Sequence, residues 1–192
     1  MNLQPEPPST GGSSGGSTTT PEPATTTTTT TTDTGVVTVT AGNAIVAVDT
    51  TLLTAMINSD KPVVIEVPAN TVASTIKVEM AASLLNASAD KQKEITIKTD
   101  DVQFVIPPAA FDVKALQDML KADPNTKITL SVKEVTPASI SLADKMGTPA
   151  NANLKAIGKV FDFELMAKSS TSESKISEFG KKLRVAIPYR DS

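Results

Sequence analysis

Short runs of alternating apolar and polar residues occupy most of the chain after residue 35. Such runs, rich in Val, Ile and Thr, predict β-strands that bury one face. The alternating or short apolar runs are Val37–Thr40, Ala44–Val48, Val63–Val67, Ser74–Met80, Ile95–Lys98, Val102–Ile106, Ile128–Val135, Lys159–Ala167 and Leu183–Ile187. Gly42-Asn43 and Asp100-Asp101 separate neighbouring runs and are typical of hairpin turns.

Helical spacing appears between these strands. Asp49-Thr50 offers an N-cap to a segment whose apolar residues recur on one helical face, namely Leu52, Leu53, Met56 and Ile57. The segment Asp112–Lys121 shows the same spacing, and shorter helical segments are predicted at Ala81–Leu85 and Pro137–Lys145. The sequence therefore predicts an α+β fold in which the sheet dominates, with hairpins and short packed helices.

Residues 1–35 have the composition of a linker. They contain five prolines, the segment Gly11–Gly16 and an unbroken threonine run from Thr25 to Thr32. Almost nothing here can be buried, so little offsets the entropy of ordering. We expect a disordered tether over 1–35 and an α+β module over 36–192. Threonine-rich stretches with proline are typical of O-glycosylated stalks, and a spacer without sugars is the alternative.

Composition excludes several kinds of chemistry. The chain has no cysteine, histidine or tryptophan, which removes thiol and histidine nucleophile systems and the usual zinc or copper ligands. The net charge is −3, and Glu6, Glu22 and Asp33 account for all of it, so residues 36–192 are formally neutral. We therefore expect neither a nucleic-acid partner nor an anionic membrane partner. No apolar run approaches the roughly 18 residues of a membrane span.

Acidic residues on the strands and two serine motifs are the remaining candidates for catalysis. Glu66, Glu79, Asp162 and Glu164 could serve as a glycosidase pair, but each lies in an alternating strand, where the solvated face is the simpler interpretation. Ser88–Lys91 and Ser172–Lys175 match Ser-x-x-Lys without the companion motifs of acyl-serine enzymes.

Binding chemistry has equally few candidates. Asp100-Asp101 and Asp123-Pro124-Asn125 offer oxygen ligands for calcium, without calcium-loop spacing, and are ordinary turn residues. Lys77 and Lys98 could form isopeptide bonds only if they were buried. We therefore expect no catalytic, metal-binding or cofactor-binding residue, no cofactor, and no enzymatic activity.

The order of the apolar segments resembles a module of Gram-positive surface proteins that occurs beside S-layer homology domains and sometimes glycoside hydrolases. The matching segments run in family order. They are Val37-Thr38-Val39 with Asp49–Ile57, Val63–Pro68, Ile76-Lys77-Val78 with Leu84-Leu85, Ile95–Thr99, Val105-Ile106-Pro107 with Phe111, Phe163-Glu164-Leu165 and Val185–Tyr189. The resemblance spans roughly residues 36–192 and carries no catalytic motif. It implies a non-enzymatic module of the cell wall or S-layer that spaces, presents or assembles neighbouring domains.

The end of the chain departs from that family. Similar proteins continue with further strands after the Ile-Pro-Tyr motif, whereas this chain stops at Asp191-Ser192. A boundary introduced by excision is one interpretation. The other is an exposed edge that assembles by strand addition.

These patterns predict a structural or interaction module of a secreted or cell-surface bacterial protein, with neighbouring domains of a longer polypeptide as its partners. The alternative is a binding module for wall polysaccharide or a protein partner. Exposed positions for Phe104, Phe111, Phe161 or Phe179 on a concave face would favour that alternative. We expect most of these rings to lie in the core, because Phe161 and Phe163 share one side of a strand.

Overall fold

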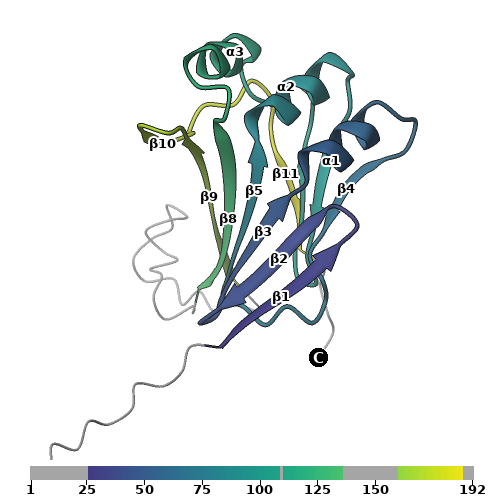
Figure 1. The fold of residues 1–192 in the computed structure, drawn as a ribbon, viewed down its shortest axis with the longest axis vertical. Helices are drawn as coiled ribbons and strands as arrows, with labels where there is room; N and C mark the ends of the chain where they lie inside the picture. Colours follow the sequence, from purple (N-terminus) through teal and green to yellow (C-terminus); the bar gives the residue numbers. More distant parts are fainter. Residues whose placement is uncertain (1–25, 109, 136–159, 188–192) are drawn as a thin grey trace, which may run out of the picture.

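The computed structural model describes residues 26–108, 110–135 and 160–187, which form two β-sheets and three short helices (Figure 1). The larger sheet has the strand order β1-β2-β3-β5-β8-β9-β10, and the smaller has the order β11-β7-β6-β4. The larger sheet contains β1 (Thr27–Thr32), β2 (Gly35–Thr40), β3 (Asn43–Val48), β5 (Thr75–Ala81), β8 (Lys127–Val135), β9 (Val160–Lys168) and β10 (Glu173–Lys175). The smaller contains β4 (Val63–Glu66), β6 (Ile95–Lys98), β7 (Gln103–Ile106) and β11 (Arg184–Ala186). The expected sheet-dominated α+β fold is confirmed.

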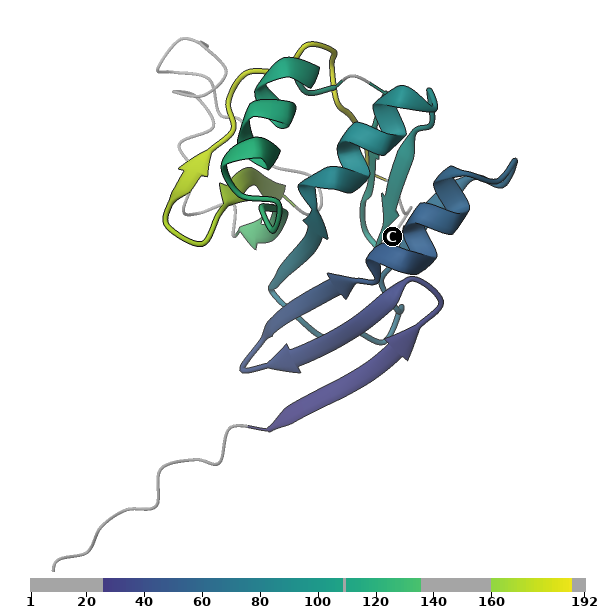
Figure 2. The ribbon, with the colours of Figure 1, turned by 45° about the horizontal axis from the view of Figure 1, so that its top comes forward.

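The helices lie in a row at one end of the two sheets, as Figures 1 and 2 show. They are α1 (Thr50–Ile57), α2 (Ala82–Asp90) and α3 (Val113–Ala122). Each connects a strand of one sheet to a strand of the other: β3 to β4, β5 to β6, and β7 to β8. The crossovers therefore close one end of the space between the sheets.

Local sequence explains where two of these helices begin. The Asp49 side chain accepts hydrogen bonds from the N–H groups of Thr51 and Leu52, at 2.8 and 3.0 Å. Asp112 accepts one from Ala115 at 3.0 Å. Both are N-caps that satisfy backbone donors left free by the first helical turn. The predicted starts at Asp49 and Asp112 are confirmed, while α2 extends further than the turn or two expected.

Both sheets and all three helices contribute to one hydrophobic core. In β3, β4, β6 and β8, alternate residues point into it, as the apolar and polar pattern of these strands predicts. The largest fully buried side chains include Leu53, Ile65, Met80, Ile97 and Leu130. Phe104 on β7 and Phe163 on β9 meet between the sheets, with ring centroids 5.8 Å apart. The two sheets are thus held together by side chains from the inward-facing positions of their strands.

The β2–β3 hairpin turns at Ala41 and Gly42, one residue before the predicted Gly42-Asn43. Both residues have positive φ, 48° and 75°, as a two-residue hairpin turn of type I′ requires. The pairing of Thr40 with Asn43 and of Thr38 with Ile45 follows from this turn. The hairpin predicted at Asp100-Asp101 also forms, between β6 and β7.

Part of the predicted linker belongs to the fold, so the boundary at residue 35 is wrong. Thr27–Thr32 form β1, which pairs antiparallel with β2 along its whole length. Thr34 is buried, and its carbonyl accepts a hydrogen bond from the N–H of Asp49 at 2.8 Å. Threonine is β-branched and favours extended backbone, and the neighbouring strand supplies the hydrogen bonds that the run alone lacks.

Two other predictions concern the later part of the chain. Ser172–Lys175, one of the two Ser-x-x-Lys segments, includes the short strand β10, which pairs with the end of β9. The predicted helix at Pro137–Lys145 and residues 1–25 of the tether lie outside the described residues. Among the described helices, none has the length and apolar character needed to cross a bilayer.

Candidate functional site

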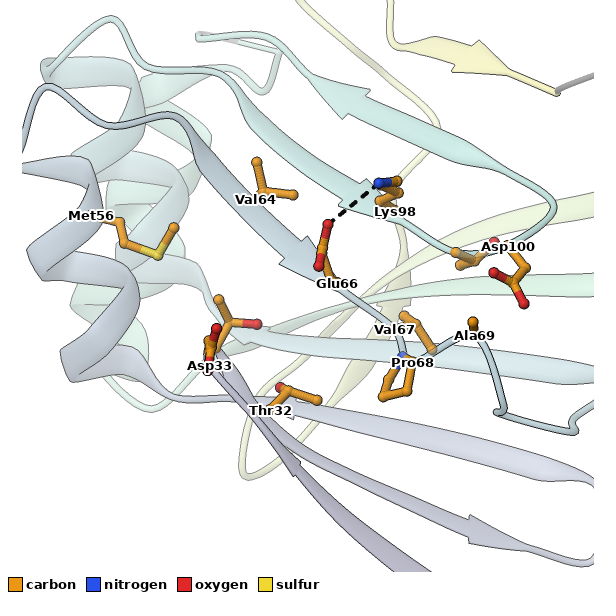
Figure 3. Close-up of a pocket in the computed structure, with 12 residues that line it drawn as sticks. Thr32, Asp33, Met56, Val64, Glu66, Val67, Pro68, Ala69, Lys98 and Asp100 are labelled. Atoms are coloured by element: carbon orange, nitrogen blue, oxygen red, sulfur yellow. Dashed lines mark hydrogen bonds and ion pairs between the residues drawn. The ribbon is translucent and has the colours of Figure 1, made fainter.

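A cleft of about 490 Å³ opens beside β4, where the smaller sheet ends (Figure 3). Its walls come from the β1–β2 turn, helix α1, strand β4 with the segment that follows it, and the end of β6. Met56, Val64, Val67 and Pro68 provide its apolar surface. We call it the β4 cleft. It exists because the larger sheet extends past the smaller one through β1 and β2.

The free backbone edge of β4 faces this opening. The N–H of Val67 donates to the carbonyl of Lys98 at 2.8 Å, so the odd-numbered residues of this strand turn their backbone groups toward β6. Successive residues of a strand point their N–H and C=O groups to opposite sides. Val64 and Glu66 therefore turn theirs away from β6, and no strand among the described residues pairs with that side of β4.

The charged residues of the β4 cleft are mostly acidic. Glu66 and Lys98 form an ion pair between neighbouring strands, with Nζ and Oε1 3.4 Å apart. Both side chains are largely exposed, so the pair adds about 0–1 kcal/mol to stability. Asp33 in the β1–β2 turn and Asp100 in the β6–β7 turn bring the lining to three carboxylates and one ammonium group. The carboxylate of Asp33 favours a neutral or basic occupant on that side of the cleft.

A second cleft, of about 480 Å³, adjoins the first and shares Val67, Pro68, Ala69, Thr99 and Asp100 with it. Its remaining walls come from the β2–β3 turn and the segment between β4 and β5. Its described lining includes Asp100, Asp101 and Glu134, and each of these residues has an interaction partner.

The carboxylates considered for glycosidase chemistry lie on the outer faces of the two sheets. Glu79 pairs with Lys127 at 3.8 Å and Glu164 pairs with Lys175 at 3.2 Å, both on the exposed side of the larger sheet. Asp162 lies opposite Lys133 in the β8–β9 ladder, and Glu66 is in the other sheet. Each acid therefore has the surroundings of a solvated strand residue, as the alternation indicated.

Neither Ser-x-x-Lys match has the geometry of an activated serine. The hydroxyl of Ser88 is buried and donates to the carbonyl of Lys93 at 2.6 Å, which fixes the end of α2. Ser172 lies in the β9–β10 turn, where its hydroxyl is 2.9 Å from that of Ser169. The ammonium group of Lys175 is engaged by Glu164 rather than directed at a serine.

The candidate calcium ligands occupy turns. Asp123 accepts hydrogen bonds from the N–H groups of Asn125 at 2.9 Å and Ser170 at 2.7 Å. The hydrogen bond from the Ser170 N–H, followed by that from Asn125, lowers the pKa of Asp123 below its ordinary value. Within the described ranges, no three side chains of types that bind metals gather into a group. Lys77 and Lys98, the isopeptide candidates, are both exposed.

The phenylalanines are mostly core residues, as expected. Phe104 and Phe111 are buried, and Phe161 and Phe163 pack against the core. Phe179 is 38% exposed and rests edge-on against Phe111, with centroids 5.8 Å apart. None of the described residues that line the β4 cleft is aromatic, so this cleft offers no ring on which a sugar could stack.

The sequence identifies individual residues of the β4 cleft as candidates, but it does not predict that they lie close together. Glu66 was considered as an acid and Lys98 as an isopeptide lysine, but their ion pair depends on the parallel register of β4 and β6. Asp33 was assigned to the linker. The turn residues Asp33, Thr34 and Gly35 between two β-branched runs were the signal that could have included it.

Comparisons of the chain with protein-family models, with curated protein sequences and with solved structures found no match. The geometry of the described residues is therefore the basis for a functional proposal. The resemblance to surface modules contributes only the expected location.

Proposed function

We propose that this chain is a structural and interaction module of a bacterial cell-surface or secreted multidomain protein, which spaces or presents neighbouring domains and performs no catalysis. The observation that carries the proposal is the unpaired edge of β4 opening into the β4 cleft. The order of apolar segments described above and the composition of residues 1–25, rich in Pro, Gly, Ser and Thr, support the extracellular location.

An extended polypeptide segment is the occupant that fits this edge best. The outward N–H and C=O groups of Val64 and Glu66 are hydrogen-bond partners for an added strand. Val64 and Met56 offer apolar contact for its side chains. The carboxylates of Glu66 and Asp33 favour basic residues in the segment.

Wall polysaccharide is the competing partner, from the second class considered above. Polar lining and open access are compatible with a sugar chain, whereas the lack of aromatic residues in the described lining removes the usual stacking platform. The two candidates differ in which amide groups they contact, since only an added strand forms hydrogen bonds with the backbone of β4.

The test is an NMR titration of the ¹⁵N-labelled full chain with two probes: the blocked peptide Lys-Thr-Val-Thr-Lys and soluble peptidoglycan fragments. We expect the peptide to shift the amide signals of Val64 and Glu66, and the same peptide with Glu in place of Lys to shift them several-fold less. Shifts caused only by the peptidoglycan fragments would establish the polysaccharide alternative. No shift with either probe at millimolar concentration would overturn the proposal.

A matched pair of variants separates backbone recognition from side-chain effects. Val64→Pro removes the outward N–H without touching the bonds to β6, and Val64→Thr keeps both the N–H and the side-chain shape. We expect peptide binding to weaken about tenfold in Val64→Pro and to change little in Val64→Thr. Equal affinities in the two variants would contradict strand addition at β4.

A further inference from the structure

The outermost strand of the larger sheet consists of threonine alone. Residues 27–31 are exposed and Thr32 is half-buried. Along the strand only one side is paired, with β2, and Figure 2 shows β1 as the margin of the sheet. Among the described residues, nothing pairs with its other side.

The two hairpins fix which backbone groups face outward. Thr32 pairs with Gly35 across the two-residue turn of the β1–β2 hairpin, and Thr40 pairs with Asn43 across the next. Residues that close two-residue turns exchange hydrogen bonds, and this exchange alternates along an antiparallel ladder. Thr28, Thr30 and Thr32 therefore bond to β2, while Thr27, Thr29 and Thr31 turn their N–H and C=O groups to the free edge.

The free edge of β1 lacks the features that prevent exposed edge strands from pairing with other chains. Exposed edge strands are commonly protected by lysine, proline, a bulge or a very short length. The run from Thr25 to Thr32 contains no charged residue and no proline, and β1 pairs with β2 without a bulge. All its side chains are β-branched, which favours the extended backbone that an incoming strand needs.

We propose that β1 pairs antiparallel with β1 of a second copy of this chain. A homopolymer is complementary to itself, so a two-fold axis through Thr29 places Thr29 opposite Thr29 of the second copy and Thr27 opposite Thr31 of the second copy. Each outward-facing threonine then donates one hydrogen bond and accepts one. The two larger sheets become one continuous sheet.

Charge supports a second copy over a charged partner. Asp33 is the acidic residue nearest the strand, and antiparallel pairing carries the two Asp33 side chains to opposite ends of the interface. Because the strand itself is uncharged, the association is expected to be insensitive to salt. Binding at the acidic β4 cleft, by contrast, is expected to weaken with salt.

Pairing through a strand of six residues makes a small interface. It falls below the roughly 1,200 Å² of total buried area that stable complexes reach, so a weak dimer is expected, with a Kd on the order of 10–100 μM. Such a dimer is significant where many copies are held close together, as on a surface, since a high local concentration compensates for weak affinity. The inference rests on the proposed function only for this high local concentration of copies at a surface.

The test is sedimentation velocity on the full chain from about 5 to 500 μM, with Thr29→Pro and Thr29→Val as the matched pair. Thr29→Pro removes an outward N–H, and Thr29→Val preserves the backbone and the β-branched shape. We expect wild type and Thr29→Val to dimerise with rising concentration, and the Kd of Thr29→Pro to be at least about tenfold higher. A monomeric wild type throughout, or equal Kd values for Thr29→Pro and wild type, would overturn the inference.

Thr29→Lys decides the question if the proline variant proves unfolded by circular dichroism. It keeps every backbone group and places two ammonium groups opposite each other at the two-fold axis. A Thr29→Lys dimer with a Kd higher than that of wild type at low salt supports the inference. A Kd equal to that of wild type contradicts it. The peptide titration at Val64 and Glu66, repeated on Thr29→Pro, shows separately whether the function proposed for the β4 cleft stands.

Discussion

The carboxylate of Asp123 accepts a hydrogen bond from the backbone N–H of Ser170, 2.7 Å away, and so joins segments 47 residues apart. Asp123 is the C-cap of α3, and Ser170 lies in the β9–β10 turn. The same carboxylate accepts from the N–H of Asn125. One ionised side chain thus anchors the end of a helix to the hairpin at the far edge of the larger sheet.

The first prediction concerns pH. The hydrogen bond from Ser170 lowers the pKa of Asp123 in the folded chain, so the unfolded chain binds more protons over the range between the two pKa values. This contribution to stability is present above the ordinary aspartate pKa and is lost as pH falls through the lowered one. A carbon-detected NMR titration is expected to give Asp123 a pKa below the ordinary aspartate value. An equal or higher value would contradict the role of the Ser170 contact.

Removal of the Asp123 carboxylate tests the same hydrogen bond through the exchange rate of the Ser170 amide. In Asp123→Ala we expect the Ser170 amide to exchange with deuterium faster, because its acceptor is gone. Asp118→Ala is the control on the same helix, since the Asp118 carboxylate forms an exposed ion pair with Lys121, at 3.4 Å, within α3 itself. Faster exchange at Ser170 in both variants would indicate general loosening of α3 instead.

The second prediction uses two adjacent leucines of α1. Leu53 is fully buried, while Leu52 is 46% exposed. Leu53→Ala is expected to lower the free energy of unfolding by about 3 kcal/mol, through lost burial and the cavity left behind. Leu52→Ala is expected to change it by less than about 0.5 kcal/mol. Urea unfolding measures both changes. It is followed by circular dichroism because the chain has no tryptophan whose fluorescence could report unfolding. Similar losses would contradict the orientation of α1.

The third prediction distinguishes two glycines that are required for different reasons. A Cβ at Gly35 would collide with the backbone oxygen of Ala47 on the neighbouring strand, whereas a Cβ at Gly42 would make only ordinary contact with the Ser74 hydroxyl, and Gly42 has a φ of 75°. Gly35→Ala and Gly35→Asn are both expected to destabilise by about 1–3 kcal/mol. At Gly42, alanine is expected to cost about 1 kcal/mol and asparagine less, since asparagine tolerates the left-handed region. Thermal unfolding of the four variants checks this, and a rescue of Gly35 by asparagine would contradict it.

The fourth prediction concerns the two Ser-x-x-Lys segments. Fluorescent penicillin is expected to label neither serine, since the buried Ser88 hydroxyl donates to the Lys93 carbonyl and the Lys175 ammonium group is paired with Glu164. Ser88→Ala is expected to lower the free energy of unfolding by about 1 kcal/mol, because it removes a buried hydrogen bond to Lys93. Ser172→Ala, at an exposed turn, is the control. Covalent labelling that disappears in either variant would show acyl-serine chemistry after all.

Elements with their own periodicity could be predicted from the sequence. The spacing of Leu53 and Ile57 and the cap at Asp49 located α1, and alternation located the strands from Ile95 to Val135. The strand β1 could not be found this way, because a run of identical residues has no alternation. Its assignment depends on the partner β2, whose Val37 and Val39 lie opposite Thr30 and Thr28. The β4 cleft could not be predicted either, because it forms where the larger sheet extends past the smaller one through β1 and β2. This arrangement depends on the position of β1.

The helical crossovers between the sheets have a consequence for how this module folds. The chain enters the smaller sheet at β4, returns to the larger at β5, and crosses again at β6 and β8. No continuous stretch of sequence holds a whole sheet, so neither sheet can be completed before the chain has crossed to the other. Folding has to close many long loops at once, which makes it slow and cooperative. A cut between two crossovers is therefore expected to destabilise both sheets together, since each sheet contains strands from both sides of the cut.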